Sequence, residues 1–246
     1  CHRLSQRRHG AGAAGRLGRV GWERLPPAHP GGAGIGPRNV RRGEGAARGA
    51  AVDVGIGVGR SDDTATLPAR RLQPGQTCRI RIHDVTSGTA RTVFETTETL
   101  FEAPNWTRDG RLIVNADGIL WELPVDGADA APTPIDIDGV PALNNDHVLH
   151  PSTDTVFVSA NDFHLYEAPL AGGNARRITS EDGPLHFLHG VRPDGQVLAY
   201  VRLEPADGNW WASATIHEIG VDGSGDRAVT THPGPADGPE YSPDGA

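Results

Sequence analysis

Residues 189–205, HGVRPDGQVLAYVRLEP, contain the unit that decides the fold. Pro193 fixes φ at the first central position of a turn, Asp194 can bond to nearby backbone, and Gly195 can adopt a positive φ. The apolar run VLAYV follows at once and predicts a β-strand. We therefore interpret these three residues as a structural turn that opens a strand, and not as a catalytic group.

The same unit recurs along the chain. Related stretches are PNWTRDGRLIVNADGILWELPVDG from Pro104, HVLHPSTDTVFVSANDFHLYEAPLAGG from His147 and PEYSPDG from Pro239, the last with the turn Pro243, Asp244, Gly245. The equivalent anchor positions are separated by 43, 42 and 50 residues, namely Arg108, Pro151, Pro193 and Pro243. A period near forty with about four short strands per unit predicts a β-propeller blade.

The remaining patterns agree with an all-β chain. Residues 78–95 alternate apolar and polar side chains around Ser87 and Gly88, which predicts a hairpin. No segment shows a helical apolar stripe, and residues 210–219 are expected to form a strand. We predict a partial, open β-propeller of about four visible four-stranded blades over residues 71–246.

Residues 1–70 differ in composition. Residues 1–60 hold 11 Arg against three acidic residues, whereas residues 61–246 hold 12 Arg against 28 acidic residues, and the chain has no Lys. A basic segment could be a nucleic-acid arm, but its lack of core-forming residues favours a disordered or artefactual tail and no nucleic-acid partner.

The ends of the sequence predict a fragment, because it contains no Met and stops inside a turn that should open another blade. No apolar run approaches the ~20 residues of a membrane span, and no signal peptide is visible. The compartment therefore stays open. With only Cys1 and Cys78, the sequence indicates neither a disulfide framework nor a cysteine zinc site.

The motifs Ser242-Pro243-Asp244-Gly245, Arg192-Pro193-Asp194-Gly195 and Arg177-Ile178-Thr179 resemble the repeats of TolB-type β-propellers. The resemblance covers roughly residues 77–245. It implies the blade architecture but fixes no single function, because similar repeats occur in the TolB envelope protein, in propellers of prolyl-oligopeptidase-type peptidases and in oligogalacturonate lyases.

Candidate binding residues precede the turns. His147 and His189 each stand four residues before their anchor Pro, where a propeller chain enters its innermost strand. With Asp146 and Glu240 they are expected to line one mouth of the central channel, where a divalent metal or an anionic sugar could bind. The alternative is that both histidines are polar channel residues without a ligand. The other histidines fit no repeat position and are expected to be exposed or hydrogen-bonded locally: His150, His164, His186, His217 and His232.

Three functions stay open. The first is a scaffold that binds a protein or peptide without catalysis or cofactor, for which an acidic surface would favour basic partners. The second is a metal-dependent carbohydrate-active enzyme, in which His147 and His189 hold the metal and Trp210-Trp211 could form a sugar platform. The third is the accessory propeller of a peptidase. No Gly-x-Ser-x-Gly nucleophile motif is present.

Overall fold

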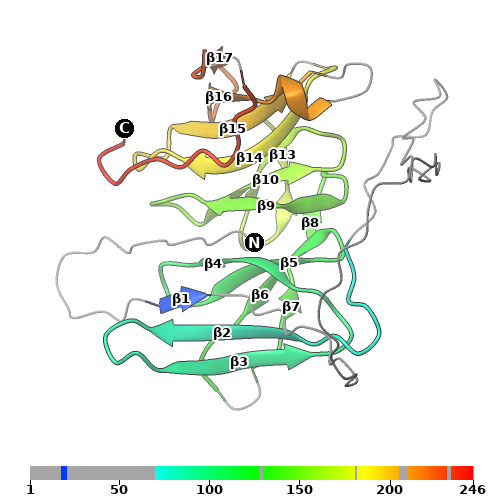
Figure 1. The fold of residues 1–246 in the computed structure, drawn as a ribbon, viewed down its shortest axis with the longest axis vertical. Coiled ribbons are helices and arrows are strands. Elements are labelled where there is room, and N and C mark those ends of the chain that lie inside the picture. Colours follow the sequence, from blue (N-terminus) through cyan, green and yellow to red (C-terminus); the bar gives the residue numbers. More distant parts are fainter. Residues whose placement is uncertain are drawn as a thin grey trace, which may run out of the picture. The chain divides into compact units, whose positions relative to one another are not determined.

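The computed structural model describes residues 18–20, 70–127, 130–180, 182–204, 210–231 and 234–245. Within these ranges the regular elements are β-strands and one 3-10 turn, Trp210–Ser213. Figure 1 shows the sheets following one another in chain order. The predicted all-β class is therefore confirmed, and the predicted strand over residues 210–219 begins only at Thr215, after the 3-10 turn.

Each four-stranded sheet is a simple antiparallel meander, the arrangement of a propeller blade. Blade 2 comprises β4 (Glu102–Trp106), β5 (Leu112–Ala116), β6 (Ile119–Leu123) and β7 (Thr133–Pro134). Blade 3 comprises β9 (Leu143–Leu149), β10 (Thr155–Ala160), β11 (Leu165–Pro169) and β13 (Arg176–Arg177). Blade 4 comprises β14 (Leu185–Val191), β15 (Val197–Leu203), β16 (Thr215–Gly220) and β17 (Arg227–Ala228).

Two smaller sheets complete the described part. Blade 1 contains the predicted hairpin, β2 (Cys78–Asp84) and β3 (Ala90–Thr96), with β1 (Gly18–Val20) paired antiparallel to β2. The strands β8 (Ile137–Asp138) and β12 (Gly173–Asn174) pair in parallel. This pair connects the chain that leaves blade 2 with the outer hairpin of blade 3. The rest of the predicted tail lies outside the described residues, as does His232.

Backbone hydrogen bonds between blades repeat with the sequence. The carbonyl of Gly118 accepts the N–H of Leu143 at 2.8 Å, and the carbonyl of Phe163 accepts the N–H of His186 at 3.1 Å. The carbonyl of Ala214 accepts the N–H of Ala236 in the same way, at 3.0 Å. Each acceptor precedes the third strand of one blade, and each donor lies at the start of the chain that enters the next. Ala236 therefore docks like the start of another inner strand.

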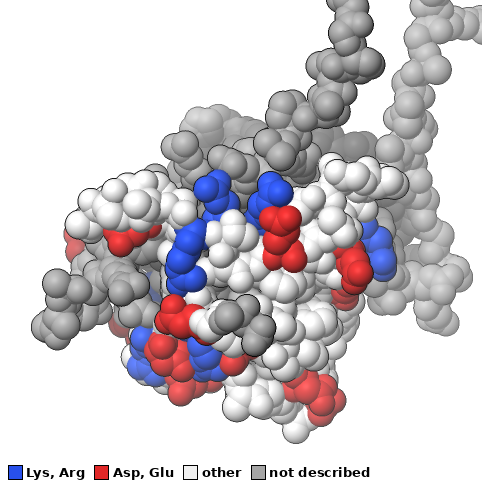
Figure 2. Space-filling model, turned by 90° about the horizontal axis from the view of Figure 1, so that it is seen from below, with Lys and Arg blue, Asp and Glu red and all other residues white. Residues whose placement is uncertain are grey.

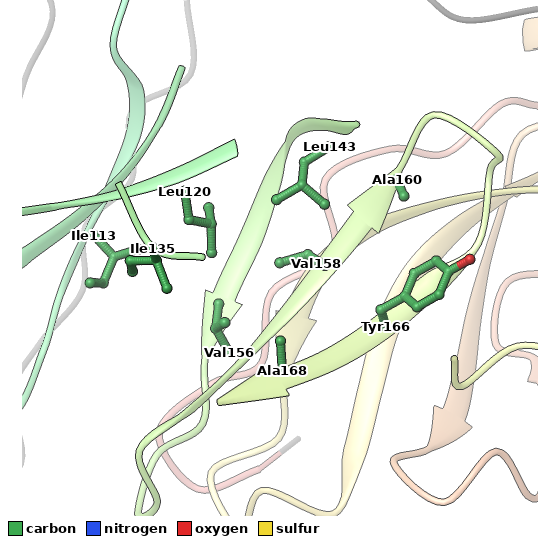
Figure 3. Packing of buried hydrophobic residues seen from close by; sticks show 9 residues of the cluster. All are labelled: Ile113, Leu120, Ile135, Leu143, Val156, Val158, Ala160, Tyr166 and Ala168. Carbon is green, nitrogen blue, oxygen red and sulfur yellow. The ribbon is translucent and has the colours of Figure 1, made fainter. Parts of the chain in front are cut away.

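Burial explains why the second strands are continuous apolar runs. All five residues of β5 are buried, with Leu112 packed toward blade 1 and Ile113 toward blade 3. Successive side chains of a strand point to opposite faces, so a strand between two blades must be apolar on both. Burying one such side chain stabilises the fold by about 1.5–3 kcal/mol. Figure 3 shows the cluster between blades 2 and 3, where Leu120 faces Val158.

Neighbouring blades also approach closely at two equivalent glycines. A Cβ added to Gly172 would lie 2.7 Å from the carbonyl oxygen of Asp136, and a Cβ added to Gly223 would lie 2.7 Å from that of Ile178. Both glycines have positive φ, +85° and +86°. Turn geometry and blade spacing therefore both require glycine at these positions.

We expect Gly223→Ala to lower the free energy of unfolding by about 2–4 kcal/mol, the sum of left-handed strain and displacement of a backbone carbonyl. Urea unfolding measures this loss. Gly88→Ala is the matched control, because Gly88 has φ +71° but nothing within 4 Å of its added Cβ. Equal losses in the two variants would show that the close approach between blades contributes nothing.

Candidate functional site

The first strands of blades 2, 3 and 4 contact one another in chain order, β4 with β9 and β9 with β14. Carboxylates gather along them. Glu102 on β4 and Asp237, after blade 4, both lie close enough to Asp146 on β9 to act on its charge. His189 Nε2 on β14 lies 3.3 Å from Asp237 Oδ1. We call Glu102, Asp146, His189 and Asp237 the channel cluster.

The Asp146 carboxyl is the most perturbed group of this cluster. Burial raises the pKa of Asp146 to about 7, and the negative charges of Asp237 and Glu102 act in the same direction. Arg70 opposes the shift, but its guanidinium already pairs with Glu102 at 3.0 Å. Within the described residues, the Asp146 carboxyl has no hydrogen-bond partner and no ion pair within 4 Å. An approaching cation would therefore stabilise the ionised form of this carboxyl, which Arg70 compensates only in part.

His147 lies elsewhere, in the interface between blades 2 and 3. Its ring is buried, with Nε2 at 3.5 Å from the Ile113 carbonyl oxygen of β5. Burial lowers the pKa of His147 to about 4, against the opposing effect of the backbone carbonyls of Ile113 and Asn145. Asn105 Nδ2 donates to the His147 carbonyl at 3.0 Å and fixes the strand there. The ring is thus neutral and structural, which differs from the expected exposure at a channel mouth.

β-Bulges at different places in β9 and β14 explain why the side chains of His147 and His189 have different surroundings. In β9 the register shift lies between Leu143 and His147, so His147 itself pairs regularly with Val158. In β14 the shift lies between Leu188 and Gly190, so His189 is the bulged residue. A bulge re-aims the side chain that it contains. Two side chains at the same spacing from their turns therefore need not point in the same direction.

The remaining predicted residues fall into two groups. Burial raises the pKa of Glu240. The backbone of Glu240 lies beside Gly190, so this residue is placed next to β14, the inner strand of blade 4. At the turn before β15, Gly195 has φ +75° and its N–H donates to Arg192 at 2.7 Å. Asp194 accepts the N–H of Gln196 at 2.9 Å. The second turn is alike: the Gly245 N–H donates to the Ser242 carbonyl at 2.9 Å, with Pro243 and Asp244 between them.

The described residues contain no group of three His, Cys, Asp or Glu side chains arranged to hold a metal ion. His147 and His189 are thus not brought into one ligand set. Cys78 is buried, and burial raises the pKa of its thiol, which leaves it unreactive. Trp211 is 48% exposed, whereas Trp210 packs against the apolar cluster of blade 4.

Sequence reasoning found Asp146 and His189 but missed Glu102 and Asp237. Glu102 opens β4, and Asp237 directly follows Ala236, whose N–H donates to the Ala214 carbonyl of blade 4. Both stand six residues before their anchors, Arg108 and Pro243, but the equivalent positions in the other two units are Asn145 and Phe187, so the spacing alone did not mark this offset as a site. A rule that inspects every acid at the entry of an inner strand would have found both.

Charge elsewhere is mixed. Figure 2 shows basic and acidic side chains close together on the face turned toward the viewer. Exposed cross-strand pairs such as Arg79 with Glu95 contribute to this pattern. Such pairs are worth little, about 0–1 kcal/mol each. In the described part of the chain, no helix has the length and apolar character needed to cross a membrane.

The comparisons with known proteins agree with the propeller architecture. No protein-family model matches the chain. An uncharacterized protein of Agrobacterium fabrum is 34% identical over 181 residues, which cover 70% of this chain and 58% of that protein. A solved structure from Agrobacterium tumefaciens, described as a TolB candidate, has 30% identity and a TM-score of 0.60 over 70% of this chain and 60% of that one.

TolB from Acinetobacter baumannii is also similar in fold, with a TM-score of 0.50 and 16% identity over 68% of this chain and 41% of that chain. The fold is therefore that of a TolB-like β-propeller. The chain spans less than two thirds of the length of each of these proteins.

Proposed function

We propose that this chain is a protein- or peptide-binding β-propeller that receives a basic segment of its partner at the channel cluster. The observation that carries the proposal is the largely buried carboxyl of Asp146, which accepts no hydrogen bond from the described residues and lies within electrostatic range of Glu102 and Asp237. Glu102, Asp146 and His189 lie on the inner strands of successive blades, and Asp237 follows blade 4; we expect this cluster to offer its hydrogen-bond acceptors to one ligand. An Arg or Lys side chain matches them in charge and in donor capacity.

The fold supports a binding role over catalysis. Propellers join several blades around a common axis and present their inner strand ends together, which suits recognition of an extended segment. Residues 61–246 hold 28 acidic residues against 12 Arg, so the chain around the cluster is acidic overall. This excess would speed the encounter with a basic partner and make binding sensitive to salt.

The test is fluorescence anisotropy with a labelled peptide of alternating Arg and Ala, and with an alternating Glu and Ala peptide as the control ligand. We expect the Arg peptide alone to bind, and to bind about tenfold more weakly near 0.15 M salt than at low salt, because screening weakens exposed charge pairs. Glu102→Gln with Asp146→Asn should abolish this binding.

The matched control is Asp136→Asn with Asp138→Asn, which removes two charges from exposed residues near the outer edge of blade 2. It should bind the Arg peptide as the wild type does. Equal weakening in both double variants would show that overall acidity is responsible and would overturn the site. Failure of the wild type to bind the Arg peptide would overturn the proposed partner class.

A further inference from the structure

Four aromatic rings form a continuous row that crosses from blade 3 to blade 4. The rings of His164 and His186 are stacked, with centroids 5.6 Å apart and planes at 28°. His186 contacts Tyr200 at 5.3 Å, and Tyr200 contacts His217 at 5.6 Å. His164 precedes β11 of blade 3, whereas the other three lie on β14, β15 and β16. The His164–His186 contact is thus the step that joins the blades.

A hydrogen bond shows that Nδ1 of His186 carries a proton. The Phe163 carbonyl oxygen of blade 3 accepts from both the backbone N–H of His186, at 3.1 Å, and its Nδ1, at 2.8 Å. Nδ1 therefore carries the ring proton. Nε2 is fully buried and has no hydrogen-bond partner among the described residues. This departs from the expectation that His186 is exposed or fully hydrogen-bonded.

His164 is held as a neutral ring of the other tautomer. The Thr179 hydroxyl oxygen accepts the Leu165 N–H at 3.1 Å and lies 2.9 Å from His164 Nδ1, to which the hydroxyl can donate. The proton of His164 then lies on Nε2, which faces Asp182 Oδ1 at 3.3 Å. Two neutral imidazoles can stack in this way, whereas two imidazolium rings repel each other.

We propose that the stacked His164–His186 contact is an acid-sensitive latch between blades 3 and 4, closed while both rings are neutral and released when acid protonates them. Protonation of His186 would add an N–H at Nε2 that faces no acceptor in the described structure. A buried donor without a partner destabilises the fold by about 1–3 kcal/mol. Protonation of both rings would add repulsion across the blade boundary.

The surrounding charges set the acidity at which the latch opens. Burial is the main cause that lowers the pKa of both rings, and Arg177 near His164 and Arg202 near His186 act in the same direction. A charge on His164 also lowers the pKa of His186. The opposing charges are Asp162 and Asp182 beside His164 and Asp226 beside His186. Asp226 is itself engaged by the Tyr200 hydroxyl and by His217 Nδ1.

The stability supplied by a neutral ring is complete above the ordinary histidine pKa of about 6.5, and it is lost as the pH falls toward the lowered value of the folded state. Each ring that stays neutral in the closed state raises the opening constant by about thirtyfold between pH 7 and pH 5, since the pH passes about 1.5 units below 6.5. The latch is therefore closed at neutral pH and weakened in mild acid.

The test is amide hydrogen exchange at the backbone N–H of His186, which donates across the blade boundary. After correction for intrinsic exchange, we expect the protection of this amide to fall between pH 7 and pH 5 in the wild type, by up to about thirtyfold for each of the two rings. In His186→Phe, which keeps an aromatic ring but cannot be protonated, the loss of protection at the position-186 amide should be smaller than in the wild type by up to about thirtyfold, because only His164 can still take up a proton. The same pH dependence in both proteins would overturn the proposal.

His83→Phe on β2 is the matched control, because it removes a histidine outside the row, and it should leave the pH dependence at residue 186 unchanged. If His186→Phe fails to fold, ring-nitrogen NMR of the wild type decides. Neutral rings at pH 7 that take up protons together with the loss of protection at residue 186 support the latch. Rings that become charged while this amide stays protected overturn it.

Discussion

The Asp146→Asn protein is expected to be more stable than the wild type at pH 8, by about 2 kcal/mol in the free energy of unfolding. Burial and two neighbouring carboxylates raise the pKa of Asp146 from 3.8 to about 7. A shift of that size corresponds to about 4 kcal/mol, and we expect about half, because the side chain retains some solvent exposure. Asn has nearly the same shape but never carries this charge.

The pH dependence of the free energy of unfolding shows why removing the Asp146 charge stabilises the protein. Between pH about 4 and 7 the folded protein keeps a proton on Asp146 that the unfolded chain has lost, so the wild type loses stability as the pH rises through this range. Asp146→Asn removes that loss. Urea unfolding at several pH values measures it, with Asp138→Asn at an exposed position as the control. Parallel pH profiles for Asp146→Asn and the wild type would show that Asp146 is ionised in the folded state like an ordinary surface acid.

The second large effect concerns the adjacent residue. His147→Leu is expected to be more stable than the wild type at pH 5, by about 2 kcal/mol, and close to it at pH 7.5. Burial lowers the pKa of His147 from 6.5 to about 4, so the stability of the neutral ring is complete above pH 6.5 and is lost as the pH falls toward 4. Leu fills a similar volume, and the contact that it removes is long, 3.5 Å from Nε2 to the Ile113 carbonyl oxygen.

Thermal or urea unfolding of His147→Leu at pH 5 and 7.5 checks this expectation. His83→Leu, a substitution outside the interface of blades 2 and 3, should show no such gain at pH 5. The outcome that contradicts a buried neutral ring is a loss of stability in His147→Leu at both pH values. That result would mean that the imidazole makes a stronger contact than the structure contains.

Asp146 and His147 are thus expected to oppose each other. Between pH about 4 and 6.5 the folded state holds one proton more than the unfolded state at Asp146 and one fewer at His147. Their two contributions nearly cancel in the wild type, so the pH dependence that remains in this range comes from other groups, His164 and His186 among them. Each single variant removes one of the two contributions and leaves the pH dependence of unfolding that the other residue causes. Measuring both variants therefore tests the two pKa shifts more strictly than measuring either one.

The recurrence of turn and strand was enough to predict the architecture. The blade anchors fall where β5, β10 and β15 begin, and the inter-blade bonds at Leu143, His186 and Ala236 follow the same period. Local chemistry explains this success, since Pro, Asp and Gly fix a turn and an apolar run buried on both faces fixes a central strand.

The site was only half predictable. The spacing from the turn selected His147 and His189 as equivalents, but bulges at different places in β9 and β14 gave them different surroundings. Histidines without a repeat position, above all His186, turned out to be buried at a blade boundary. The repeat spacing along the sequence does not predict such a contact, because the contact joins a turn of one blade to a strand of the next.

The sequence by itself determined that this chain folds into all-β blades and where each blade begins, because those features depend on residues a few positions apart. Only the tertiary structure decided which side chains influence one another between blades: the charges of Glu102 and Asp237 act on Asp146, and the ring of His164 stacks on that of His186. The physical reason is that direction and burial depend on strand register and on the neighbouring sheet. A one-residue bulge changes both without changing the spacing along the chain.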